Sequence, residues 1–326
     1  MYNKFKIIIV NALIIFLMIL LVEFFLFTKE YLRLEDETKK QNISQNHTIQ
    51  DFSLYNYIKV LYATYLSITK SNIEITKDFF RPISSYSQDK NKEKLPIILL
   101  GCSYTYGEAL SEKETFAYIL SKYSKREIYN LGLGDRSPRT MLYIMRENFE
   151  YIKEELLNNN LCFEYIIYTY IPDHKRRLYV NIVQNDIPYY KIIQKHDKEY
   201  LQFVNYNFLT KTYIYKNIME LIYKYKNKHN QKGIFDTFII YMKEINKEIQ
   251  SKINCKKKKP QFIILVYEED GTENWNTLKQ DNIIIVKMKE DLNIDIDKKE
   301  YKLLDNHPNS KAWQVIVPAL VKELNL

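Results

Sequence analysis

The chain has 326 residues, of which 46% are hydrophobic and 27% charged, and its formal net charge is +8. This balance is that of a core-forming globular protein and excludes collagen-like and wholly disordered chains. Glycine is scarce, with only 6 residues, and no glycine-rich phosphate loop is present. The positive charge is spread along the chain apart from the run at 256–259, where we expect a solvated segment and no nucleic-acid site.

The N-terminal segment is almost continuously apolar over residues 7–27, interrupted only by Asn11 and Glu23. About 20 apolar residues suffice for a helix to cross a bilayer, and no small-x-small cleavage site comes after the run. We therefore predict a single-pass transmembrane anchor over residues 1–28, with the lipid bilayer as its partner through 7–27. A lone N-terminal hydrophobic segment ahead of a large domain usually exports that domain, so we expect the bulk of the chain to be extracytoplasmic, in the periplasm or at the cell surface.

A polar and charged linker follows the predicted anchor. It covers residues 29–94, and apolar residues at helical spacing predict one amphipathic helix over about 57–72. The three cysteines form no C-x-x-C pair, so we expect neither a disulfide framework nor a zinc knuckle. We place the main domain at residues 95–326.

Short apolar, β-branched runs alternate with helical patterns in this domain. The expected strands are 96–100, 127–131, 165–170, 261–267 and 282–287, and the expected helices are 114–123, 139–157, 235–253 and 310–324. Continuous apolar strands between helices predict a parallel sheet of about five strands covered on both faces, which is a three-layer α/β sandwich. The interval 178–230 breaks the alternation. Its two tyrosine-rich runs predict a hairpin followed by a helix, in an insertion that covers or shapes a site.

Two polar blocks follow strands of the predicted sheet, at the edge where ligands bind in open α/β folds. The first strand is followed by Gly-Cys-Ser-Tyr-Thr-Tyr-Gly at 101–107, which places Ser103 on a tight strand-to-helix turn. The last strand is followed by Asp-Asn-His-Pro-Asn-Ser at 305–310. Taken alone, the first block is equally typical of a turn that starts a helix, and the second of a helix cap.

A serine nucleophile needs a general base, usually histidine, that is oriented by a carboxylate. Of the five histidines, only His174 and His307 follow strands of the predicted sheet. His307 also has Asp305 two residues before it, which favours it as the base. Cys102 as a thiol nucleophile is a poor alternative, because the neighbour of Ser103 on such a turn points away from the same histidine.

The two blocks together resemble those of the SGNH/GDSL hydrolases. The first is similar to the G-x-S-x-T-x-G nucleophile block, with Cys102 where that family commonly has Asp. The second resembles the D-x-H-P-N ending of a membrane-anchored or exported bacterial branch. The resemblance runs from about Leu95 to the C-terminus and implies a flavodoxin-like sheet. It also implies a catalytic triad of Ser103, His307 and Asp305 that needs no cofactor. The sequence shows no cluster of residues with the spacing of metal ligands.

The resemblance further implies oxyanion donors from three blocks. The backbone amide of Ser103 is the first donor, and the second comes from the block at 130–135, where register favours Gly134 over Gly132 and leaves Asp135 open. The third block lacks the family's Asn and reads Tyr-Ile-Pro-Asp-His at 170–174. His174 is a candidate replacement for that Asn, and a histidine packed on the domain surface is the equal alternative.

The function that this resemblance implies is that of a serine-dependent ester hydrolase or O-acyltransferase. Its expected substrate is an acylated carbohydrate or other ester, in particular an acetylated envelope glycan, with a membrane acyl-transfer partner if the acceptor is a sugar. The alternative is a catalytically weakened, anchored SGNH domain that serves as a glycan-binding or scaffolding module. The missing Asn favours this alternative, whereas the presence of all three triad residues argues against it.

Overall fold

The computed structural model describes residues 18–19, 21–26, 28, 94–134, 136–147, 149–155, 162–180, 189–195, 198–204, 213–253, 259–279, 281–303 and 305–326. The chain divides into two compact units. The first unit comprises Met1–Ile73, Asn181–Asp186 and Tyr206–Ile222, and the second comprises Glu74–Val180, Ile187–Asn205 and Tyr223–Leu326. The second unit contains the sheet and the candidate site.

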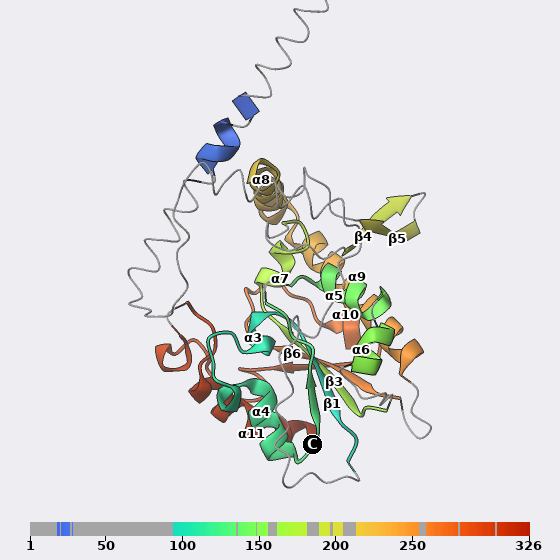
Figure 1. Ribbon diagram of the computed structural model, residues 1–326, viewed down its shortest axis with the longest axis vertical. Helices are drawn as coiled ribbons and strands as arrows, with labels where there is room; N and C mark the ends of the chain where they lie inside the picture. Colours follow the sequence, from blue (N-terminus) through green and yellow to red (C-terminus); the bar gives the residue numbers. More distant parts are fainter. Residues whose placement is uncertain are drawn as a thin grey trace, which may run out of the picture. The chain divides into compact units, whose positions relative to one another are not determined.

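The central sheet has five strands: β1 (Ile97–Leu100), β2 (Ile128–Asn130), β3 (Tyr165–Tyr170), β6 (Gln261–Val266) and β7 (Ile283–Lys287). All neighbours are parallel, in the order β2-β1-β3-β6-β7 (Figure 1). This confirms the predicted parallel five-stranded sheet. The strand order reverses at β1, which lies between β2 and β3, and a crevice for ligands is expected at such a switch point.

Successive residues of β1 point to opposite faces of the sheet, as the period of a strand requires. Ile98 and Leu100 enter one apolar cluster, and Ile97 and Leu99 enter the other. The first cluster is covered by α5 (Pro138–Glu147), α6 (Phe149–Glu155), α9 (Gln231–Lys252) and α10 (Asn276–Lys279), and the second by α4 (Phe116–Ser124) and α11 (Ser310–Leu324) (Figure 1). The result is the three-layer arrangement that buried strands on both faces predict.

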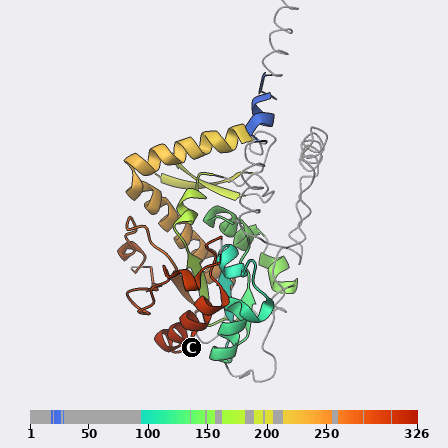
Figure 2. The same cartoon turned by 90° about the vertical axis from the view of Figure 1, so that its left-hand side faces the viewer.

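A hairpin and a helix follow β3, as the tyrosine-rich runs predict. β4 (Tyr189–Lys195) and β5 (Lys198–Val204) pair antiparallel in a small sheet of their own. α8 (Tyr213–His229) then leads into α9 after a single residue (Figure 2). That residue is Asn230, whose side-chain oxygen accepts the Gly233 N–H at 3.0 Å and so starts a new helix.

The remaining short elements lie in the loops of the second unit. They are α3 (Ser103–Tyr106), η2 (Glu112–Glu114), α7 (Asp173–Arg176) and η4 (Lys299–Tyr301). Cys162 is disulfide-bonded, with its partner outside the described residues. The cysteine spacing did not predict this bond.

The N-terminal residues that the structure describes, among them 21–26, are helical. Within the described part of the chain, no helix has both the length and the apolar content that a membrane crossing requires. Most of the predicted anchor at 7–27 and all of the predicted linker helix at 57–72 lie outside the described residues. The anchor, and with it the boundaries at 28 and 94, stays a prediction.

Candidate active site

Ser103 begins a single helical turn directly after β1. Cys102 is still extended, with φ −102° and ψ −153°, and the turn ends at Gly107, whose φ of 80° lies in the left-handed region that glycine adopts without strain. Only 2% of Ser103 is exposed. The strand-to-helix turn therefore holds the serine at the carboxyl end of β1, where the strand order reverses.

The loop after β2 approaches the serine turn so closely that only glycine fits. A methyl group at Gly132 would lie 2.7 Å from the backbone nitrogen of Tyr106 and 2.9 Å from the carbonyl carbon of Thr105. Contacts this short to backbone atoms are not relieved by a side-chain rotation. The scarce glycines thus mark the edge of the sheet where two loops meet beside the candidate nucleophile.

The structure brings His307 to Ser103 across 204 residues of sequence. The Nε2 atom of His307 lies 2.8 Å from the Ser103 hydroxyl oxygen, and its Nδ1 lies 2.9 Å from Oδ2 of Asp305. The contact between Nδ1 and Asp305 is as short as an ion pair, but its geometry is not that of a hydrogen bond. In enzymes without bound substrate, hydrogen bonds between catalytic groups are often poorly aligned and improve when the substrate binds. The three side chains are therefore in contact in the order that a nucleophile, a base and an orienting carboxylate would require.

The loop that carries His307 is fixed by its own backbone. Asn306 adopts a left-handed φ of 67°, and the carbonyl oxygen of His307 accepts the Leu303 N–H at 2.8 Å. Asn309 caps α11 by accepting the Ala312 N–H at 3.0 Å, and its amide donates to the Glu300 carbonyl oxygen at 2.8 Å. The block at 305–310 is therefore both a helix cap and the support of the candidate base.

Tyr104 is a site residue that the sequence analysis missed. Its hydroxyl donates to the Asn306 carbonyl oxygen at 3.1 Å, and its ring centroid lies 5.0 Å from that of His307. Burial raises the pKa of Tyr104, so its hydroxyl stays protonated as a donor. The side chain next to the nucleophile thus positions the loop that carries the base. The only signal in the sequence is an aromatic residue directly after Ser103.

The backbone amides around Ser103 differ in whether they already donate a hydrogen bond within the described part of the chain. The Gly132 N–H donates to the side-chain oxygen of Asn130 at 3.0 Å, and the Asn130 amide donates to the Thr105 carbonyl oxygen at 3.0 Å. The Gly132 N–H group therefore already has a hydrogen-bond acceptor within the fold. Among the described residues, the amides of Ser103 and Gly134 donate to no other group. This pattern favours Gly134 over Gly132, and Asp135 lies outside the described residues.

His174 belongs to the core. Its side chain is fully buried, and Nδ1 lies 2.9 Å from the Tyr168 hydroxyl oxygen. Burial, together with the charge of Arg177, lowers the pKa of His174 to about 3, so the ring is neutral. Nε2 of His174 is buried and has no hydrogen-bond partner among the described residues, so the expectation that His174 replaces the family's Asn as an oxyanion donor stays a prediction. The buried position also differs from the surface histidine that was the alternative.

Cys102 has none of the properties of a nucleophile. Its side chain is free of disulfide bonding, fully buried and part of the apolar cluster under α4 and α11. Burial raises the pKa of the Cys102 thiol, so the thiolate that would react is disfavoured.

Ion pairs stabilise the loops around the site. The Asp173 carboxylate accepts hydrogen bonds from Nε of Arg176 and Nε of Arg177, both at 2.5 Å. Burial opposes ionisation of Asp173, but these guanidinium groups outweigh it and lower its pKa to about 2. The buried Lys175 ammonium binds Asp270 at 2.6 Å and Glu273 at 2.9 Å. The loop after β3 is thereby tied to the loop after β6.

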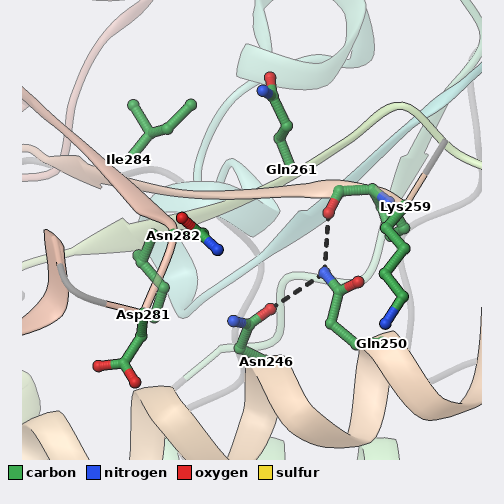
Figure 3. Close-up of a pocket in the computed structure, with 9 residues that line it drawn as sticks. Asn246, Gln250, Lys259, Gln261, Asp281, Asn282 and Ile284 are labelled. Carbon is green, nitrogen blue, oxygen red and sulfur yellow. Dashed lines mark hydrogen bonds between the residues drawn. The ribbon is translucent and has the colours of Figure 1, made fainter.

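Two hollows lie at opposite edges of the sheet. Figure 3 shows one of about 610 Å³ at the amino ends of β6 and β7, where the Gln250 amide donates to Asn246 and to the Pro260 carbonyl oxygen. It lies away from the edge that carries Ser103. The other, of about 310 Å³, lies at the carboxyl ends of these strands and includes Tyr267 and Glu268 in its lining. The Tyr267 ring is 5.2 Å from that of Tyr104, so this hollow borders the candidate site.

No protein-family model and no curated protein matches the chain. Among solved structures, it is similar to a G-D-S-L family protein from Desulfitobacterium hafniense DCB-2, with 11% identity and a TM-score of 0.40 over 71% of this chain and 99% of that one. It is also similar to the salicylyl-acyltransferase SsfX3 from a tetracycline biosynthetic pathway, with 10% identity and a TM-score of 0.39 over 72% of this chain and 56% of that one. A third similar structure is the acetyl xylan esterase Est2A from the rumen bacterium Butyrivibrio proteoclasticus, with 12% identity and a TM-score of 0.39 over 71% and 63%.

These likenesses are too weak to carry a functional argument. The case for an activity rests on the side-chain geometry at the carboxyl end of β1. Among the described residues, no cluster of His, Cys, Asp and Glu is arranged to hold a metal ion.

Proposed function

We propose that the chain is an SGNH-type serine esterase or O-acyltransferase that works through a covalent acyl-enzyme. The observation that carries this proposal is the 2.8 Å contact between His307 Nε2 and the Ser103 hydroxyl, with Asp305 at the other ring nitrogen. The G-x-S-x-T-x-G and D-x-H-P-N blocks support it, because each residue of the triad comes from one of them.

In the first half-reaction, His307 Nε2 takes the Ser103 proton as the serine oxygen attacks the ester carbonyl. The N–H groups of Ser103 and Gly134 donate to the oxyanion that forms, and one such donor typically contributes about 10²–10³ in rate. The tetrahedral intermediate collapses, its carbon–oxygen bond to the alcohol breaks, and the imidazolium protonates the departing alkoxide. The acyl group is then an ester of Ser103.

In the second half-reaction, His307 removes a proton from the acceptor, which attacks the acyl-enzyme. Water as the acceptor releases the acid and makes the chain an esterase, whereas a sugar hydroxyl makes it an O-acyltransferase. Asp305 stabilises the imidazolium in both halves and holds the ring in the tautomer that keeps Nε2 free to accept a proton.

We propose an acylated, in particular acetylated, envelope glycan as the substrate. The hollow beside Tyr267 contains carboxylates and lysine side chains, which suit hydroxyl-rich ligands better than an acyl chain of lipid length. We further propose that the anchor predicted at 7–27 keeps the domain beside a lipid bilayer, within reach of a membrane acyl-transfer partner. The disulfide at Cys162 supports an extracytoplasmic location, because disulfides persist in oxidising compartments.

A catalytically weakened domain that binds glycan or scaffolds a membrane partner is the second candidate. The observation that favours it is the missing Asn, because the loop after β3 has the fully buried His174 instead of the family's exposed amide donor.

Covalent labelling separates the two candidates. We expect the full chain to react with a fluorophosphonate probe and to release p-nitrophenol from p-nitrophenyl acetate, and Ser103→Ala to do neither. Ser251→Ala, at an exposed serine on α9, is the matched control and should behave like the parent chain. Equal labelling of Ser103→Ala would refute the nucleophile assignment, and an unreactive parent chain would favour the weakened domain.

A further inference from the structure

Helix α8 carries an apolar stripe that stays open to solvent. Ile218, Leu221, Ile222 and Tyr225 follow one another at i, i+3, i+4 and i+7, which places them on one face of the helix. Their side chains are 38% to 67% exposed. A contiguous apolar face on a soluble surface usually marks a site of interaction with a protein or a membrane.

The C-terminal part of the same helix has contacts within the second unit. The Tyr223 ring lies 6.1 Å from the Tyr179 ring, and Nζ of Lys226 lies 4.7 Å from the Tyr179 ring centroid. These contacts orient the last two turns of α8.

Lysine side chains border the stripe. Lys224 and Lys228 follow Leu221 at i+3 and i+7, and Lys226 follows Ile222 at i+4, so basic groups lie along both edges. All three are exposed. The helix has four lysines and a single glutamate. A helix with aliphatic and aromatic residues on one face and Lys along its borders is the kind that lies in the plane of a membrane interface.

A contact within the first unit joins α8 to the apolar N-terminal segment. The Glu23 carboxylate accepts the Ile214 N–H at 2.8 Å, in the first turn of α8. A carboxylate satisfies one of the free N–H groups at a helix start and complements the helix dipole. Glu23 interrupts an apolar run in which Leu21 and Phe25 are about two-thirds exposed. The first turn of α8 therefore lies beside the segment predicted to enter the bilayer.

We propose that α8 lies in the membrane interface, with its apolar stripe among the acyl chains and its bordering lysines on anionic headgroups. Long lysine side chains can reach the headgroups while their stems cover apolar surface. An anionic lipid surface fits better than a second copy of this chain, because a symmetric pairing of α8 with itself would place lysine against lysine. This interface contact goes beyond the esterase or acyltransferase chemistry, which does not require it.

The proposal is tested with the full chain reconstituted in nanodiscs of phosphatidylcholine alone or of phosphatidylcholine with phosphatidylglycerol. Leu221→Cys is labelled with the environment-sensitive fluorophore NBD without reductant, since Cys102 is buried and Cys162 is disulfide-bonded. Lys247→Cys on α9 is the control, with a lysine side chain that is 74% exposed. We expect NBD at 221 to shift to the blue and to be quenched by doxyl-labelled lipid in anionic discs, with no change at 247.

A water-like emission at 221 in both kinds of disc would overturn the proposal. So would a blue shift that lipid quenchers leave unchanged and that grows with protein concentration, because it would indicate a second copy or another protein on the stripe.

Charge reversal tests the lysine border. We expect the double variant Lys224→Glu/Lys228→Glu to lower partitioning of the labelled helix into anionic discs by roughly five-fold per lysine, the contribution of one basic residue near an anionic surface. Its thermal unfolding midpoint should match that of the parent chain, because both lysines are exposed. Unchanged quenching in this folded variant would count against the anionic lipid surface.

Discussion

One carboxylate, that of Asp305, holds both the backbone and the ring of His307. Its Oδ1 atom accepts the His307 N–H at 3.0 Å, and its Oδ2 atom lies 2.9 Å from Nδ1 of the same residue. A short acidic side chain commonly accepts the N–H two residues on, so the spacing of the D-x-H block follows from this geometry. The carboxylate that we propose to stabilise the imidazolium thus also accepts a backbone hydrogen bond in the turn from which the ring projects.

Replacing Asp305 should therefore affect catalysis and loop structure separately. Asp305→Asn keeps an oxygen that can accept the His307 N–H but loses the charge that stabilises the imidazolium. We expect kcat/KM for p-nitrophenyl acetate to fall by about 10²–10⁴, with little change in the unfolding midpoint. Asp236→Asn, at an exposed side chain on α9, is the control. Retention of more than half the parent activity in Asp305→Asn would argue against its role.

Tyr104 should act by positioning the base. Tyr104→Phe keeps the ring next to His307 but loses the hydrogen bond to the Asn306 carbonyl oxygen. A neutral hydrogen bond contributes about 1 kcal/mol, so we expect kcat to fall about five-fold. KM should stay constant, because the lost bond holds the catalytic loop and does not bind substrate. A rise in KM at constant kcat would instead place Tyr104 in substrate binding.

Gly132 and Gly134 should respond differently to alanine. At Gly132 the added methyl meets backbone atoms at 2.7 Å and 2.9 Å, whereas at Gly134 its nearest neighbour is a carboxylate oxygen of Glu108 at 3.8 Å. We expect Gly132→Ala to lower the unfolding free energy by about 1–3 kcal/mol, as overpacking does, and to displace the serine turn. Gly134→Ala keeps the N–H donor and should leave stability within about 0.5 kcal/mol. Denaturant unfolding measures both, and equal stabilities would contradict the close approach.

The parallel sheet and the contact of Ser103 with His307 were predictable because their signals are local. Each strand is a short apolar run. The first block lies at the end of β1, and the second lies in the loop between β7 and α11, so the rule that ligands bind at the carboxyl edge brings the blocks together. The helix at 310–324 was predicted with the bounds of α11, because Asn309 caps it and the apolar spacing continues to Leu324.

Other features depend on tertiary packing and could not be read from the residues alone. Nothing in the spacing of His174 indicates that its ring is fully buried and contacts the Tyr168 hydroxyl. The bond from Tyr104 to Asn306 joins residues 202 positions apart. The choice of Gly134 over Gly132 depends on which amide Asn130 occupies, and only the folded loop shows that.

The buried His174 should make stability depend on pH. Because burial and Arg177 lower its folded pKa to about 3, while an unfolded imidazole titrates near 6.5, only the unfolded state takes up a proton between these values. Its contribution to stability is complete above pH 6.5 and is lost as the pH falls towards 3, by about 1.4 kcal/mol per pH unit. Urea unfolding should therefore show the parent chain losing about 2 kcal/mol more than His174→Gln between pH 7 and 5. The Gln side chain does not titrate, so the comparison uses the change in unfolding free energy with pH and holds even if the variant is less stable at every pH. Parallel pH profiles of the two chains would show that His174 is protonated in the folded state or reaches solvent.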